Sequence, residues 1–229
     1  MSEMKPDASR CVVIGDLVAS RRSADRRSLQ QALNAALAEV DESCPSISGL
    51  RVTVGDEFQG SYRRLGDALE VALRVRIRLL PEGDVRVGIG RGRVTVLDAE
   101  RGIEDGPGWW AARAALVAVE EAAERSPTRL LRTGVRTAAG VGADAVAEQG
   151  ADETGLGAAV NAALLCRDHL VGSLSERSLR LLEGLMHPDT TQAALAEREG
   201  VSASAVSQRV RIDGIGAVLA AQALLRDLP

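Results

Sequence analysis

Aromatic residues are scarce in this sequence, which holds two tryptophans, one tyrosine and one phenylalanine among 229 residues. The hydrophobic fraction of 45% is nevertheless ordinary, so Val, Leu, Ile and Ala must build the core, which favours helices packed on a Val/Ile-rich sheet. No apolar run approaches the roughly 18 residues of a membrane helix, and the polar residues 1–10 lack the apolar segment of an export signal. We therefore expect a cytoplasmic protein without a membrane segment.

Residues that build metal, disulfide or nucleophile sites are also few. Cys11, Cys44 and Cys166 are odd in number and lack metal-like spacing, which argues against a disulfide framework. His169 and His187 are isolated, so we interpret both as surface or packing residues. No P-loop is present. The net charge of -4 argues against nonspecific coating of nucleic acid but allows a small DNA reader with a local arginine cluster.

The N-terminal part alternates between strand and helix patterns. A short apolar run broken by Gly15 and Asp16 indicates a buried strand, and the helical pattern that follows has Ser23 as a plausible N-cap. Apolar spacing and turn residues predict a strand at 11–18, a helix at 23–40, a hairpin at 50–54 and 57–62, a helix at 65–80, a strand at 85–96, a helix at 109–123 and a strand around 130–137.

The C-terminal part has only helical patterns. They predict helices at 158–170, 175–185, 191–198, 202–211 and 215–225. The expected fold class is α/β (α+β) with two domains, residues 1–157 and residues 158–229.

Two acids stand beside glycine at expected strand ends. Asp16 follows Gly15, and Asp56 follows Gly55 at the hairpin turn beside Glu57. Glycine lets a ligand approach the backbone closely, and neighbouring carboxylates repel each other unless a cation joins them. Mg²⁺ prefers a few carboxylates plus substrate phosphates, so the pattern predicts a metal–phosphate site. The alternative is that these Gly-Asp pairs are ordinary turn residues.

Four segments resemble known nucleotide cyclases. VVIGDLVASR is similar to the first metal-binding strand of class III cyclases, and VTVGDEFQG is similar to their Gly-Asp hairpin and to the GGDEF signature. VRVGIGRGRV resembles the following strand, and DGPGWWAARAAL resembles the segment that ends in a catalytic arginine. The overall match is to the SatD family, which implies a ferredoxin-like nucleotide-cyclase or palm-type domain followed by an all-α helix-turn-helix domain.

The resemblance also implies roles for single residues. Asp16 and Asp56 would be paired metal ligands, with Glu57 a third ligand or a supporting acid. Arg113 would match the arginine that stabilises charge on the transferring phosphoryl group. The implied nucleotide-binding residues are Gly15, Arg21, Arg22, Gly55 and Trp109, although Arg21 and Arg22 equally fit a solvated surface.

Three positions depart from the cyclase patterns. Val52 stands where adenine-selecting cyclases have lysine, Trp109 stands where they have asparagine, and Val54 replaces the first glycine of GGDEF. The resemblance therefore implies a domain that binds a nucleotide or its metal complex and leaves cyclisation open. Trp109 either stacks on a purine, or one of Trp109 and Trp110 packs in the core while the other covers it or meets a partner subunit.

The segment TQAALAEREGVSASAVSQRVR has a helix-turn-helix layout. Gly200 allows the turn, Val201 packs between the helices, and Ser202 is an N-cap. Serine, glutamine and arginine suit base edges and phosphates, so the expected DNA-contacting residues are Ser202, Ser204, Ser207, Gln208, Arg209 and Arg211. The alternative is a helical bundle that serves for dimerisation.

The combined pattern predicts a transcriptional regulator. Its expected partners are a purine nucleotide or cyclic nucleotide, double-stranded DNA and a second copy in a homodimer, with Mg²⁺ as cofactor. Two alternatives stay open. One is an active Mg²⁺-dependent nucleotidyl cyclase or phosphotransferase that the helix-turn-helix localises, and the other is a degenerate cyclase-like scaffold for dimerisation.

Overall fold

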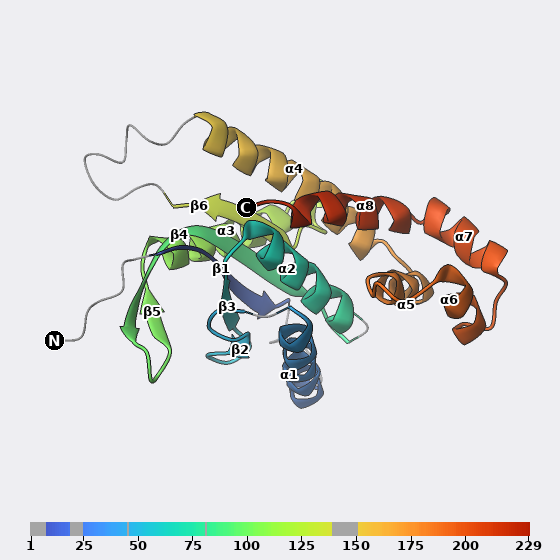
Figure 1. Ribbon diagram of the computed structural model, residues 1–229, viewed down its shortest axis with the longest axis horizontal. Coiled ribbons are helices and arrows are strands. Elements are labelled where there is room, and N and C mark those ends of the chain that lie inside the picture. Colours follow the sequence, from blue (N-terminus) through green and yellow to red (C-terminus); the bar gives the residue numbers. More distant parts are fainter. Residues whose placement is uncertain (1–7, 19–24, 45, 81, 139–150) are drawn as a thin grey trace.

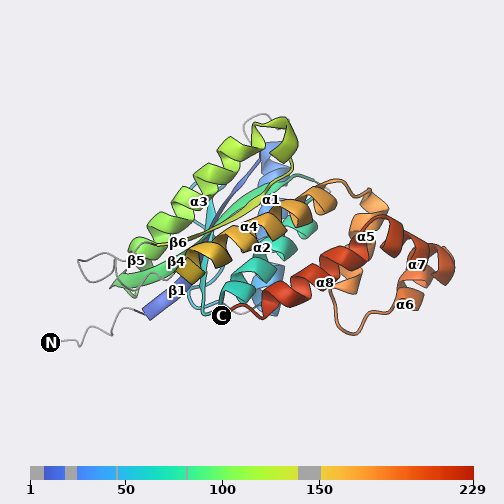
Figure 2. The ribbon, with the colours of Figure 1, turned by 90° about the horizontal axis from the view of Figure 1, so that it is seen from above.

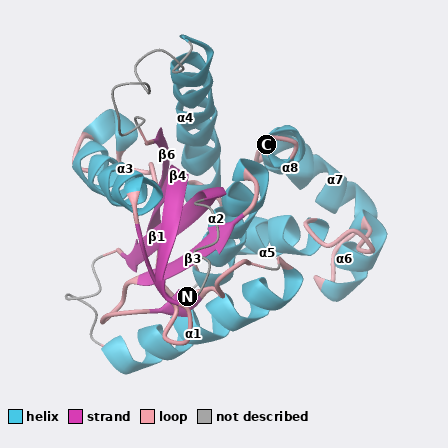
Figure 3. Ribbon diagram, turned by 60° about the vertical axis from the view of Figure 1, so that its left-hand side comes forward, coloured by secondary structure: helices cyan, strands magenta, loops and turns pink. Residues whose placement is uncertain are grey.

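The structure is a computed structural model that describes residues 8–18, 25–44, 46–80, 82–138 and 151–229. The fold is mixed α+β, with one sheet, helices on both of its faces and a group of helices at one end of the molecule (Figure 1). Figure 3 shows the sheet between α3 on one side and α2 on the other.

Six strands form the sheet. They are β1 (Ala8–Leu17), β2 (Arg51–Val52), β3 (Phe58–Tyr62), β4 (Val85–Asp98), β5 (Ile103–Asp105) and β6 (Thr133–Thr137). The order is β2-β3-β1-β4-β5, and β6 pairs with β4. The β4–β6 pair is parallel and the other pairs are antiparallel. The pattern at 50–62 correctly predicts a hairpin, whereas the short strand β5 was not predicted.

Helices occupy most of the remaining described chain. They are α1 (Arg26–Ser43), α2 (Leu65–Leu79), α3 (Pro107–Ala123), the 3-10 helix η2 (Ser126–Thr128), α4 (Ala151–Gly172), α5 (Glu176–Leu185), α6 (Gln192–Arg198), α7 (Ala203–Ile212) and α8 (Ile215–Arg226). One cap differs from the prediction. Asp25 caps α1 by accepting a hydrogen bond from the Ser28 amide at 2.9 Å, and Ser23 lies outside the described residues.

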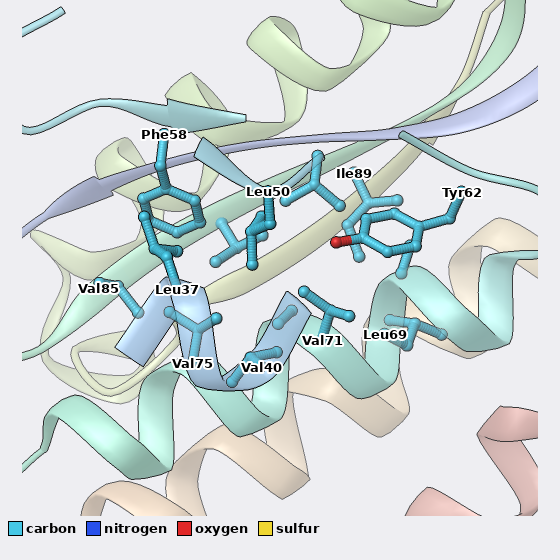
Figure 4. Close-up of a cluster of buried hydrophobic side chains, with 14 of the residues drawn as sticks. Leu37, Val40, Leu50, Phe58, Tyr62, Leu69, Val71, Val75, Val85 and Ile89 are labelled. Atoms are coloured by element: carbon cyan, nitrogen blue, oxygen red, sulfur yellow. The ribbon is translucent and has the colours of Figure 1, made fainter. Parts of the chain in front are cut away.

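One face of the sheet carries the main apolar core. Helices α1 and α2 cover this face, and Figure 4 shows Phe58 and Tyr62 from β3 among aliphatic side chains such as Leu69 and Val75 of α2. Phe58 and Tyr62 are fully buried. The two rings thus fill the space between the sheet and the helices, and aliphatic residues supply the rest of the core.

The other face brings α3 unusually close to β4. Gly88, Gly90 and Gly92 alternate along β4 and face this helix. A Cβ atom on Gly88 or Gly90 would overlap with backbone atoms of Ala112 or Gly108 in α3. The alternating glycines of VRVGIGRGRV are therefore required for backbone-to-backbone packing between β4 and α3.

Among the described strands β6 pairs with β4, and α4 covers its other edge. The side-chain amide of Asn161 on α4 accepts a hydrogen bond from the backbone N–H of Val135 and donates one to its carbonyl oxygen, both at 2.9 Å. A neighbouring strand would offer the same donor and acceptor. Asn161 therefore satisfies backbone groups that a sheet edge leaves exposed.

A buried ionic cluster joins α4 to the sheet and to α2. Its members are Arg76, Asp84, Arg132, Arg167 and Asp168. The Asp168 carboxylate is fully buried and accepts hydrogen bonds from the backbone amides of residues 132 and 133 at 2.8 and 2.7 Å. Burial lowers the pKa of Arg167, and the charge of Asp168 acts in the opposite direction. The cluster fixes the position of α4.

Two of the last four helices, α5 and α8, pack directly on α2. Helices α5 to α8 share a second apolar core that includes Leu73 and Ile77 of α2. Helix α8 runs back along α2 (Figure 2), and the backbone amides of Leu65 and Gly66, the first residues of α2, donate to carbonyl oxygens of residues 229 and 228, each at 3.1 Å. The predicted domain boundary between residues 157 and 158 falls inside α4.

Candidate functional site

Asp16 lies at the end of β1 and is opposite Arg86 of β4 in the antiparallel register. Both carboxylate oxygens of Asp16 accept hydrogen bonds from Arg86, one from Nε and one from Nη2, each at 2.9 Å. The remaining nitrogen of this guanidinium, Nη1, donates to Glu120 of α3. Asp16 is therefore held in a bidentate ion pair that connects two strands and a helix.

The surroundings of Asp16 disfavour an unpaired carboxylate. Burial raises the pKa of Asp16 above its ordinary value, and the carboxylates of Glu120 and Asp56 raise it further. Hydrogen bonds from Arg86 and its positive charge act in the opposite direction. A partly desolvated acid that faces other acids needs a nearby cation, and Arg86 is that cation.

The predicted hairpin places Glu57 next to Arg113. Its turn contains Gly55 at φ +63°, a left-handed conformation that favours glycine. Both carboxylate oxygens of Glu57 accept hydrogen bonds from the guanidinium of Arg113 on α3, at 2.6 and 2.7 Å. These hydrogen bonds raise the pKa of Arg113, and the charge of Asp16 contributes in the same direction.

These residues form one group of charges, which we call the acid–arginine site: Asp16, Asp56, Glu57, Arg86, Arg113 and Glu120. The structure thus brings together the four predicted residues Asp16, Asp56, Glu57 and Arg113. Sequence reasoning missed Arg86 and Glu120. The antiparallel register of β1 and β4 could have identified Arg86, whereas the packing of α3 was needed to identify Glu120.

The predicted metal ligands do not fit a divalent cation as they are arranged. Both oxygens of Asp16 and both oxygens of Glu57 accept hydrogen bonds from guanidinium groups. Among the described residues, no three His, Cys, Asp or Glu side chains are grouped to hold a metal ion, and Asp56 forms no ion pair there. Arginine side chains therefore hold the positions around Asp16 and Glu57 that a metal would need.

Trp109 and Trp110 adopt the predicted alternative in which one of the two rings packs in the core. Trp109 lies in a small core with Val12 and Ile14 and is 9% exposed, so its ring is not free to stack on a base. Trp110 is 59% exposed and donates from Nε1 to Asp105 at 3.0 Å. One tryptophan therefore packs in the core and the other lies at the surface.

Gly15, which the resemblance places at the nucleotide, packs against the core. Gly15 faces the ring of Phe58, with which a Cβ atom would overlap. Glycine is therefore required here because the Phe58 ring packs against it, on the opposite face of the strand from Asp16. Arg21 and Arg22 lie outside the described residues.

Helix α7 carries the residues predicted to contact DNA. The Ser202 hydroxyl caps the helix by accepting from the Ala205 amide at 3.1 Å, and Arg209 pairs with Asp213 at 3.3 Å. The other predicted residues, Ser204, Ser207, Gln208 and Arg211, are exposed. A cleft of about 320 Å³ lies between α5 and α7 and is lined in part by Gln208 and Arg209.

None of the described helices is long and apolar enough to cross a membrane.

The model of one protein family, described as the SatD family, matches residues 11–228. No curated protein matches the chain.

Among solved structures, the chain is similar to a bacterial light-regulated adenylyl cyclase, with 10% identity and a TM-score of 0.41 over 56% of this chain and 43% of that chain. It is similar to the guanylyl cyclase Cya2 with 13% identity and a TM-score of 0.39, over 50% of this chain and 72% of that one. It is also similar to the guanylyl cyclase domain of the RhoGC fusion protein from the aquatic fungus Blastocladiella emersonii, with 19% identity and a TM-score of 0.38. This match covers 51% of this chain and 78% of that one.

Proposed function

This chain belongs to the SatD family, and we propose that it is a transcriptional regulator that binds double-stranded DNA through α7 and a nucleotide at the acid–arginine site. The observation that carries this proposal is the exposed face of α7, where Ser204, Ser207, Gln208 and Arg211 are free of described partners. Side chains of these types recognise base edges and phosphates.

The packing of α6 and α7 supports a helix-turn-helix. Gly200 between them has φ +64°, which permits the sharp turn. Leu195 of α6 and Val206 of α7 are buried in the shared core, and Val201 packs against it. Because Val206 and Val210 of α7 pack on this core, the polar residues on the other side of the helix are left exposed, as a recognition helix requires.

A nucleotide at the acid–arginine site would bind through Arg113. This side chain is about half exposed, and its carboxylate partner Glu57 is also in contact with water. Such partly exposed ion pairs contribute little stability, about 0–1 kcal/mol, so a phosphate group can replace Glu57 on the guanidinium fork. The carboxylates around Arg113 repel a phosphate group, so the Glu57 side chain has to move away from Arg113 when the phosphate binds.

Helix α8 would connect the two sites. It begins directly after α7, and residues 228 and 229 after its end accept hydrogen bonds from the first amides of α2. Helix α2 in turn follows β3, the second strand of the acidic hairpin. We propose that nucleotide binding at the hairpin changes the position of α7 through this connection.

DNA binding is tested by selecting sequences from a random double-stranded pool with the full chain and measuring affinity by fluorescence anisotropy. Gln208→Ala should relax the preference at one base pair, by about 1–3 kcal/mol of discrimination. Arg211→Ala should weaken all sequences and lower the salt slope by about one. Gln31→Ala and Arg27→Ala, which alter exposed residues of α1, are matched controls. Failure to enrich any sequence would refute DNA binding.

Nucleotide binding is tested by calorimetric titration with ATP, GTP and their cyclic products, with and without Mg²⁺. Arg113→Gln should weaken binding about tenfold or more, since a bidentate charged contact is lost, whereas Arg101→Gln at an exposed position should not. Each mixture is also assayed for product. Turnover would replace the regulator with the cyclase or phosphotransferase alternative.

A further inference from the structure

Arg86 binds the two carboxylate oxygens of Asp16 that a metal cation would otherwise coordinate. Its guanidinium contacts both oxygens of the carboxylate at 2.9 Å, which is the bidentate geometry that strengthens charged hydrogen bonds. The side chains of Asp16 and Arg86 are 25% and 16% exposed. The contact is therefore shielded from water more than an ordinary surface ion pair is.

The position of Arg86 is set by the backbone and by a third side chain. Residues 16 and 86 are direct partners in the β1–β4 register, so their side chains leave the sheet on the same face. Glu120 of α3 accepts from the remaining guanidinium nitrogen. All three nitrogens of the fork thus have acceptors, which holds Arg86 in this orientation.

From this arrangement we infer that Arg86 replaces a divalent cation as the counterion of Asp16, so that the acid–arginine site does not take up Mg²⁺ or Mn²⁺. A divalent cation would have to displace the guanidinium and break two charge-assisted hydrogen bonds. The charge of Asp56 acts on Asp16, but Asp56 forms no ion pair among the described residues and would supply one carboxylate, and one such ligand binds a hard cation weakly. The inference concerns the metal alone and does not depend on a nucleotide or on DNA.

The experiment titrates the full chain with Mn²⁺ and measures free Mn²⁺ by electron paramagnetic resonance. Wild-type protein should show no saturable site that Asp16→Asn removes. Arg86→Met should gain one saturable site, because it frees Asp16 and removes a positive charge. The site should bind Mn²⁺ about tenfold or more tightly than the weak residual binding of the wild-type protein, equivalent to at least one charge-assisted hydrogen bond. Arg101→Met, which removes a charge at an exposed position, should resemble wild type.

Two further measurements keep the result interpretable. Thermal unfolding shows whether Arg86→Met is folded, and Arg86→Lys, which keeps the charge but loses the fork, should gain less affinity than Arg86→Met. The inference is wrong if wild type binds one Mn²⁺ saturably and Asp16→Asn loses it, a result that needs no Arg86 variant. It is also wrong if folded Arg86→Met binds no more Mn²⁺ than wild type.

Discussion

Two clusters of arginine and carboxylate side chains differ in their contact with water and with the backbone. In the buried ionic cluster, Arg167 and Asp168 have almost no exposed surface, and Asp168 also accepts hydrogen bonds from two backbone amides. In the acid–arginine site, Asp16 is 25% exposed, and within the described part of the chain its carboxylate accepts hydrogen bonds from the side chain of Arg86. The same pair of chemical groups therefore occurs in two different environments.

The different surroundings of the two clusters suit them to different roles, one in stability and one in ligand binding. A carboxylate held by backbone amides cannot change partners without disrupting the strand that supplies them. A carboxylate such as Glu57, whose arginine partner Arg113 is about half exposed, can give up that partner when a phosphate group reaches the arginine. We therefore assign the buried ionic cluster to stability and the acid–arginine site to ligand exchange.

The largest effect is expected for Asp168→Ala. It leaves Arg167 buried without its partner and removes the acceptor of two backbone amides, so the free energy of unfolding should fall by about 3–5 kcal/mol. Urea denaturation followed by circular dichroism measures this change. A loss below about 1 kcal/mol, typical of exposed pairs, would remove the distinction between the clusters.

A smaller loss is expected for Gly90→Ala. The added methyl group overlaps the α3 backbone, and overpacking of this kind costs about 1–3 kcal/mol. Because Glu120 and Arg113 both lie on α3, the variant should also disturb the acid–arginine site while the buried ionic cluster persists. The matched control is Gly155→Ala, where nothing contacts the added atom and helix propensity predicts a gain of about 0.5–1 kcal/mol.

Asp16→Asn should leave stability at neutral pH unchanged or slightly higher. The raised pKa of Asp16 means that its stabilising contribution is present below the unfolded pKa of about 3.9 and is lost as pH rises through the folded pKa. The variant should therefore be no more stable than wild type below about pH 3.9, and its free energy of unfolding should equal or slightly exceed that of wild type above the folded pKa of Asp16. Urea unfolding across this pH range tests the sign, and destabilisation at neutral pH would contradict it.

The smallest effect is expected for Glu57→Gln. The ion pair with Arg113 is partly exposed, so its loss should change the free energy of unfolding by about 1 kcal/mol or less. Thermal unfolding is the measurement, and Arg78→Gln, which breaks a comparably exposed pair with Glu39, is the control. A large loss at Glu57 alone would give this residue a structural role.

Periodicity predicted the elements that have one clear apolar face. The helix expected at 65–80 is α2 (Leu65–Leu79), and the strand expected at 85–96 lies within β4 (Val85–Asp98). The three-residue strand β5 was missed because it has too few residues to show alternation and is mostly exposed. Whether so short a segment forms a strand depends on the strand that it pairs with, and the local sequence pattern carries no information about that partner.

The candidate site was predicted only in part for a related reason. Glycine beside acid identified Asp16 and Asp56, and a motif identified Arg113. The partner of Asp16 depends on strand register, and the partner of Arg86 depends on which face of α3 meets the sheet. Trp109 and Trp110 show the same limit, because adjacent helical residues point in different directions and only packing decides which of them is buried.

The amide of Asn161 has a consequence for how the chain folds. It closes the β6 edge from a helix that lies later in the sequence, so the edge is open to strand addition until α4 has docked. During refolding, a second molecule can pair with β6 in that interval, and this competition grows with protein concentration. Once α4 has docked, Asn161 occupies the backbone groups of Val135 that a second chain would need for pairing.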